Sequence, residues 1–179
     1  LKDFTWRYVR GQCLVGEQVV GVQTGANGVP PVARVDHSPD GTLVATVSGV
    51  DPMVRVWDVA KRQLLYVLAG HRLGAHAVAF NPDGRTIATG GGDNTVCIWE
   101  LPATPPKTGP VRLAPKFTLT GHTNAVEAVA FTADGRRLAS AGADGSIRLW
   151  DAPPPAGDRP RARPTAAGVL KEHAGTVWC

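Results

Sequence analysis

Residues 127–151 have the sequence EAVAFTADGRRLASAGADGSIRLWD, and the chain contains two further versions of the same pattern. These are HAVAFNPDGRTIATGGGDNTVCIWE at 76–100 and VARVDHSPDGTLVATVSGVDPMVRVWD at 32–58. A pattern that returns every few tens of residues indicates a repeat architecture. Each version has an Asp-Gly pair near its middle and ends in Trp plus an acid: Asp40-Gly41, Asp83-Gly84 and Asp134-Gly135, then Trp57-Asp58, Trp99-Glu100 and Trp150-Asp151.

The spacing of these landmarks predicts short strands. The terminal Trp residues are 42 and then 51 residues apart, and the Pro-rich insertion LPATPPKTGPVRLAP at 101–115 lengthens the second interval. The Asp-Gly pair and the Trp are 16 residues apart in the second and third copies and 17 in the first, which places one extra residue at 49–52. Apolar segments alternate with turns, as in an antiparallel meander. The strands predicted for the third copy are 126–131, 137–140 and 146–150, and a fourth strand follows each Trp at 64–68, 116–119 and 168–170.

The composition favours the same fold class. The 179 residues include 21 Gly and 15 Pro, and so many helix breakers exclude long helices, a helical bundle or a coiled coil. A single four-stranded sheet cannot bury both of its faces, so each copy must pack against the next, and about three copies are needed for stability. We therefore predict an all-β protein built of stacked sheets.

The repeated segments resemble the WD-repeat, or beta-transducin-like, family. The resemblance rests on Gly70-His71 and Gly121-His122, on Asp93 and Asp144, and on the Asp-Gly and Trp-acid pairs. It implies a β-propeller of four-stranded antiparallel blades, present as an incomplete ring of about three full blades plus part-blades. The expected segments are a lead-in at 1–28, which could supply the outer strand of a neighbouring blade, blade one at 29–69, blade two at 70–119, blade three at 120–171 and the first strand of a truncated further blade at 172–179.

In this family His, Asp, Ser or Thr, and Trp form a hydrogen-bonded set inside each blade. The resemblance therefore implies structural sets of His71, Thr89, Asp93 and Trp99 in blade two and of His122, Ser140, Asp144 and Trp150 in blade three. Blade one matches with Thr46, Asp51 and Trp57, but Gly28 occupies the position of the His, so we expect that blade to be less rigid. A catalytic triad is the competing interpretation, and recurrence of the set at blade positions argues against it.

No other motif indicates a catalytic or metal site. The glycines at 90–92 lack the Lys and the helix of a phosphate-binding loop and predict a tight turn. His37 and His76 have no partners at metal-ligand spacing, so we expect each to be an isolated surface or strand histidine. Cys97 fits a packed strand. We expect no enzyme activity, no metal and no cofactor.

WD-repeat propellers usually bind partners through the loops that lead into each first strand and the turns before each third strand. On this sequence the candidate partner-binding residues are Arg72, Leu73, His76, Asn124, Ala125 and Glu127, with Val50, Gly92 and Ala143 at the turns. Recognition commonly resides in loops carried by a rigid scaffold. We call the end of the molecule that carries these loops the loop face.

The remaining segments do not repeat. Residues 1–28 resemble the aromatic-rich lead-in of some bacterial multidomain proteins, including ones with an upstream serine/threonine kinase domain. The Pro-rich segments 102–115 and 152–164 predict extended, mobile rim loops or partner ligands. Glu172-His173 and Val177-Trp178 match the start of a fourth copy, so we expect the chain to be a fragment. The missing blades would come from the same longer chain or from an oligomer.

Charge and composition limit the function classes. Residues 29–151 carry 12 Lys or Arg against 11 Asp or Glu, and this near-neutral body disfavours nucleic-acid binding. No apolar run is long enough to span a membrane, and three cysteines without close spacing suggest a reducing, cytoplasmic (intracellular) location. We expect a non-catalytic scaffold that docks proteins or peptides and has no small-molecule substrate. The alternative is a regulatory or sensor region of a larger protein, such as a bacterial serine/threonine kinase whose catalytic domain is absent here.

Overall fold

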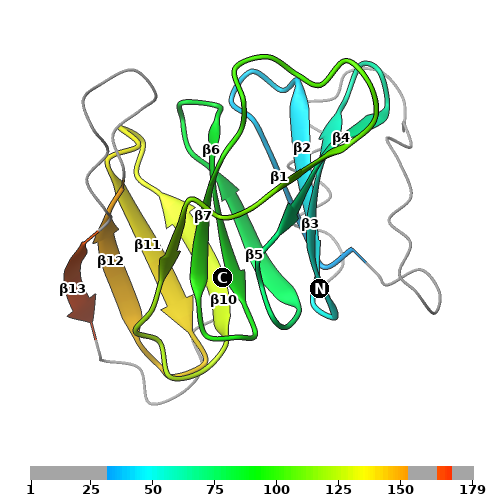
Figure 1. Cartoon of the computed structure of the whole chain (residues 1–179). Coiled ribbons are helices and arrows are strands. Elements are labelled where there is room, and N and C mark those ends of the chain that lie inside the picture. Colours follow the sequence, from blue (N-terminus) through cyan, green and yellow to red (C-terminus); the bar gives the residue numbers. More distant parts are fainter. Residues whose placement is uncertain (1–31, 153–164, 171–179) are drawn as a thin grey trace, which may run out of the picture.

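The computed structural model describes residues 32–152 and 165–170. They form three β-sheets that stand side by side, and none of them belongs to a helix (Figure 1). The predicted all-β class with propeller-type blades is confirmed, and within the described residues the sheets do not close into a ring. The lead-in at 1–28, the position of Gly28 and the predicted strand at 172–179 lie outside the described residues.

The three sheets correspond to the three copies of the sequence pattern. Blade one consists of β1 (Arg34–His37), β2 (Leu43–Ser48), β3 (Asp51–Asp58), β4 (Gln63–Ala69) and β8 (Val111–Leu113), in that spatial order. Blade two consists of β5 (Ala75–Phe80), β6 (Thr86–Gly91), β7 (Val96–Glu100) and β9 (Phe117–Leu119). Blade three consists of β10 (Val126–Phe131), β11 (Arg137–Gly142), β12 (Ile147–Asp151) and β13 (Ala166–Leu170).

The Asp-Gly pairs form the turns between the first two strands of each blade. Gly41, Gly84 and Gly135 have φ of 69°, 67° and 66°, in the left-handed region that disfavours residues with a side chain. In blade two, Gly84 N–H donates to the carbonyl of Asn81 at 2.9 Å, and Asp83 accepts from Arg85 N–H at 2.8 Å. The left-handed backbone explains why Gly recurs, and the hydrogen bond to the carboxylate explains why Asp recurs.

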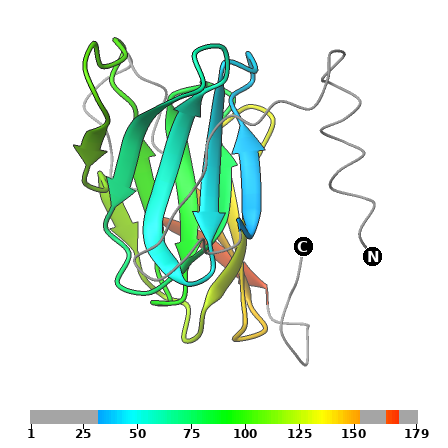
Figure 2. The same ribbon diagram turned by 90° about the vertical axis from the view of Figure 1, so that its right-hand side faces the viewer.

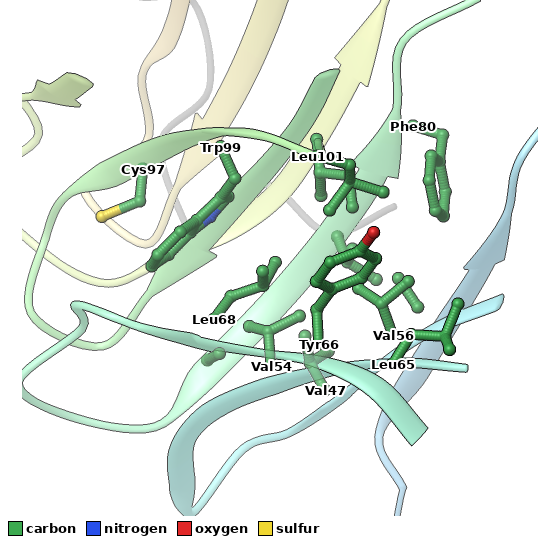
Figure 3. Packing of buried hydrophobic residues seen from close by; sticks show 14 residues of the cluster. Val47, Val54, Val56, Leu65, Tyr66, Leu68, Phe80, Cys97, Trp99 and Leu101 are labelled. Atoms are coloured by element: carbon green, nitrogen blue, oxygen red, sulfur yellow. The ribbon is translucent and has the colours of Figure 1, made fainter. Parts of the chain in front are cut away.

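The main apolar core lies between blades one and two. Trp99 and Tyr66 are its largest side chains, and both are buried, together with Val54, Val56 and Leu68 (Figure 3). A second cluster joins blades two and three and includes Ile98, Val126, Leu138 and Trp150. Each blade therefore buries one of its faces against the next, as the repeat pattern requires.

The first strands of the three blades surround a hollow of about 460 Å³. It is lined by residues of β1, β5 and β10, including Asp36, Phe80 and Phe131. Two hydrogen bonds link neighbouring blades near the C-terminal ends of the first strands. Phe80 N–H donates to Asp36 Oδ2 at 2.7 Å, and Asn81 Nδ2 donates to the carbonyl of Gly135 at 2.9 Å.

The Pro-rich insertion departs from the prediction. Residues 102–115 were expected to form an extended rim loop or a partner ligand, but residues 111–113 form β8, which pairs in parallel with β4 at the outer edge of blade one (Figure 2). Leu113 packs on the core there, and Pro115 lies against Gly70. The prediction was wrong because an isolated Val-Arg-Leu between prolines carries no strand periodicity of its own.

Leu68 and Leu170 provide a matched test of this core. Leu68 is 0% exposed in β4, whereas Leu170 is 56% exposed in β13. We expect Leu68→Ala to lower the free energy of unfolding by about 2–5 kcal/mol because it leaves a cavity, and Leu170→Ala to change it by less than about 0.5 kcal/mol. Urea unfolding of the whole chain measures both, and equal losses would contradict the placement of the core.

Candidate functional site

A chain of buried hydrogen bonds crosses blade two. His71 precedes β5, and its Nδ1 lies 3.1 and 3.2 Å from the two carboxylate oxygens of Asp93. Its Nε2 lies 2.8 Å from Thr89 Oγ1, which accepts the indole N–H of Trp99 at 2.9 Å. An indole can only donate and a carboxylate can only accept. The neutral imidazole therefore donates from Nδ1 to Asp93 and accepts at Nε2 from the Thr89 hydroxyl.

Blade three contains the same chain of bonds. His122 Nδ1 lies 3.0 and 3.2 Å from Asp144, and its Nε2 lies 2.8 Å from Ser140 Oγ. Ser140 Oγ accepts the indole N–H of Trp150 at 2.9 Å. The hydroxyl residues Ser140 and Thr89 are 1% and 0% exposed. A hydroxyl that is buried and already accepts an indole N–H is not presented to a substrate, unlike the nucleophile of a triad.

Blade one has a different arrangement. Trp57 N–H donates to Thr46 Oγ1 at 3.1 Å. Asp51 instead forms an ion pair with Arg55 at 2.8 Å and accepts the backbone N–H of Met53 at 2.9 Å. The three residues that match the family pattern are thus divided between two separate contacts.

Two acids connect these buried chains to the loop face. Asp93 accepts the backbone N–H of Arg72 at 2.8 Å, and Asp144 accepts that of Thr123 at 2.9 Å. Both loops are closed again by a backbone bond, from Gly92 N–H to the Gly74 carbonyl at 2.9 Å in blade two. The backbones of the loops that lead into β5 and β10 are therefore held by the carboxylates of Asp93 and Asp144.

Glycines and hydroxyl residues that were not predicted from the sequence make room for this arrangement. A Cβ at Gly91 or Gly142 would overlap Nδ1 of His71 or His122. The hydroxyl of Thr95 donates to Asp93, and that of Ser146 donates to Asp144, both at 2.7 Å. The signal was present, because in blades two and three a Gly lies two residues before the turn Asp and a hydroxyl residue lies two residues after it.

The candidate partner-binding residues fall into two groups on the loop face. Arg72, Leu73 and Asn124 are exposed, and Ala125 is half-buried. His76 and Glu127 are half-buried and contact each other, with Nδ1 of the imidazole 3.2 Å from both carboxylate oxygens. Each lies where the first strand of its blade shifts register, as at a β-bulge. The expectation that His76 is isolated was therefore wrong.

Burial controls the titration of the two central imidazoles. Desolvation lowers the pKa of His71 and His122, although the facing carboxylates act in the opposite direction. Burial alone would raise the pKa of Asp93, but hydrogen bonds from Arg72, Thr95 and His71 hold it below its ordinary value. In Asp144, hydrogen bonds from Ser146, Thr123 and His122 likewise outweigh burial, and the pKa lies well below its usual range. Both sets therefore remain a neutral imidazole beside an ionised carboxylate.

The described residues give little support for a metal site, a reactive thiol or a membrane-spanning helix. Among residues 32–152 and 165–170, no three His, Cys, Asp or Glu side chains gather in a way that could hold a metal ion. Burial raises the pKa of the Cys97 thiol to about 11, so the thiolate nucleophile is scarce at neutral pH. Within the same residues, no helix has the length and apolar character to cross a membrane.

Replacing Ser140 with Ala tests the buried chain of hydrogen bonds. It removes the hydroxyl that contacts both His122 and Trp150, and each buried group left without a partner costs about 1–3 kcal/mol. We expect the urea midpoint to fall clearly for Ser140→Ala and only slightly for Ser140→Thr, because blade two uses Thr89 at the same position. A loss of similar size in both variants would contradict the role given to the hydroxyl.

The same residues predict how stability changes with pH. Folding lowers the pKa of His71 and His122 from 6.5, so below pH 6.5 the unfolded chain binds more protons and the free energy of unfolding falls. We expect the urea midpoint to decrease from about pH 7 to about pH 5, and to decrease less in a His71→Asn/His122→Asn variant. A wild-type midpoint that is constant or rises on acidification would refute this assignment.

Comparison with known proteins places this geometry in a family. The family model described as WD domain, G-beta repeat, matches residues 18–58, 62–100 and 113–151. Similar proteins are Protein hir-1 of Neurospora crassa, 35% identical over 136 residues, and a subunit of chromatin assembly factor 1 from Gallus gallus, 30% identical over 182 residues. Striatin-3 of Homo sapiens is 32% identical over 117 residues.

These matches differ in how much of each protein they cover. They take in 63%, 89% and 63% of this chain, but only 13%, 31% and 15% of the respective relatives. The chain thus spans less than a third of the length of these relatives. Since the three segments that match the family model cover more than half of the chain and each contains the first three strands of one blade, the protein belongs to the WD40-repeat family.

Proposed function

We propose that this chain is a non-catalytic scaffold that docks protein or peptide partners on its loop face. The observation that carries the proposal is the contrast between fixed backbone and exposed side chains there. Asp93 and Asp144 hold the loops through the backbone N–H groups of Arg72 and Thr123, while the side chains of these loop residues extend into solvent. The backbone of such a surface loses little conformational entropy when a partner binds.

The family membership supports this function. The relative from chromatin assembly factor 1 is, by its name, one subunit of an assembly, and its alignment covers 89% of this chain. The hydroxyls of Thr89 and Ser140 are buried and burial raises the pKa of the Cys97 thiol, so none of these three groups is presented as a nucleophile. Recognition is thus better supported than catalysis.

Site-specific photo-crosslinking tests the proposal. Asn124 and Arg136 are both exposed in blade three but lie at opposite ends of it, Asn124 before β10 and Arg136 in the turn that follows β10. We expect benzoylphenylalanine at position 124 to form more protein adducts in cells than the same group at position 136. The reason is that a docked partner covers only the loop face.

Two results would contradict this function. Equal yields of protein adducts from positions 124 and 136 would mean that the loop face is not preferred. Adducts at position 124 whose added mass disappears on nuclease treatment would assign the face to nucleic acid instead. The urea midpoints of both substituted proteins serve as the control for folding.

A further inference from the structure

Two exposed apolar side chains lie on adjoining loops of the loop face. Among the described residues, Val50 at 76% and Leu73 at 58% have the largest exposed fractions of any large hydrophobic side chains. The loops that carry them are in contact, because a Cβ at Gly74, next to Leu73, would overlap the carbonyl of Gly49 and lie 2.9 Å from Val50 N. The pair therefore bridges the β2–β3 turn of blade one and the loop before β5.

The fold does not require an Arg-Leu pair in the loop before β5. In blade three the residues equivalent to Arg72 and Leu73 are Thr123 and Asn124, and the backbone there makes the same bond to the turn Asp. A Thr-Asn pair thus satisfies the scaffold, while blade two exposes an Arg-Leu pair. Exposed apolar side chains that adjoin one another commonly mark an interaction site.

The charges around the pair indicate what would bind. Asp51 is engaged by Arg55, and Glu127, whose side chain is 12% exposed, is engaged by His76. The side chain of Arg72 is exposed, and no ion pair joins it to any acid of residues 32–152 or 165–170. The accessible charge beside the apolar pair is therefore positive, which favours a partner carboxylate.

We propose that Val50, Leu73 and Arg72 form a docking patch for a polypeptide segment that presents an aliphatic side chain next to an acidic one. The aliphatic side chain packs on Val50 and Leu73, and the carboxylate pairs with the Arg72 guanidinium. This inference rests on the proposed function and specifies the chemistry of the partner. Burial of the apolar contact would also strengthen the adjacent ion pair by excluding water.

Peptide selection tests this patch with random sequences in place of a defined partner. A phage library of random peptides is selected on the whole chain, and the enriched peptides are synthesised with a fluorescein label. Binding is then measured by anisotropy to the wild type and to Arg72→Thr/Leu73→Asn, which carries the residues of blade three. The control is Arg136→Thr/Val111→Asn, which replaces an exposed Arg and an exposed aliphatic residue outside the loop face; Val111 is 39% exposed and pairs with Tyr66 in the middle of β4.

We expect enriched peptides with adjacent acidic and aliphatic residues. Their Kd should rise at least about tenfold in Arg72→Thr/Leu73→Asn and stay unchanged in the control. Replacing the acid with Lys, or the aliphatic residue with Ser, should weaken binding to a similar degree.

Three results would overturn the inference. Basic or purely polar peptides that depend on Arg72 and Leu73 would show that the chemistry is wrong while docking on the loop face remains. Acidic-aliphatic peptides that bind both double variants equally would place their site elsewhere. If the selection returns no peptide that depends on this patch while position 124 still forms protein adducts, the inference fails and the proposed function stands.

Discussion

The rest of the structure depends on one buried path of hydrogen bonds, from an indole through a hydroxyl and an imidazole to a carboxylate. Its direction is determined at both ends, since Trp99 and Trp150 can only donate and Asp93 and Asp144 can only accept. In a low-dielectric interior the loss of one member leaves its neighbours unpaired and lowers stability. It joins the third strand of a blade to the loop before its first strand, so packing in the core fixes the backbone at the loop face.

The three blades use this path unequally. Blades two and three contain all of it, whereas the Asp51 carboxylate of blade one is directed to Arg55. Contacts between blades compensate in part, through Asp36 with the Phe80 backbone and through the apolar core around Trp99. The exposed Val50 and Leu73 lie where blade one adjoins blade two. Blade two contains His71, whereas no His of the described residues takes that place in blade one.

Repetition made much of the fold predictable. Three copies fix the register of strands and turns, and Trp, Asp and Gly recur because each is needed for a specific bond or conformation. Features that occur once were missed. The pairing of β8 depends on a distant edge rather than on its own sequence, and the contact between His76 and Glu127 depends on a β-bulge in two different blades. At the candidate site, sequence predicted which side chains occupy the loop face but not that these two contact each other.

The position of β8 has a consequence for how the chain gains and loses structure. It joins the edge of blade one, yet the chain reaches it only after β7 and returns from it to β9 of blade two. Blade one therefore cannot complete its hydrogen-bonded edge during synthesis until most of blade two has emerged. Separation of blade two pulls on the segment that forms this edge, so we expect blades one and two to open together in hydrogen exchange.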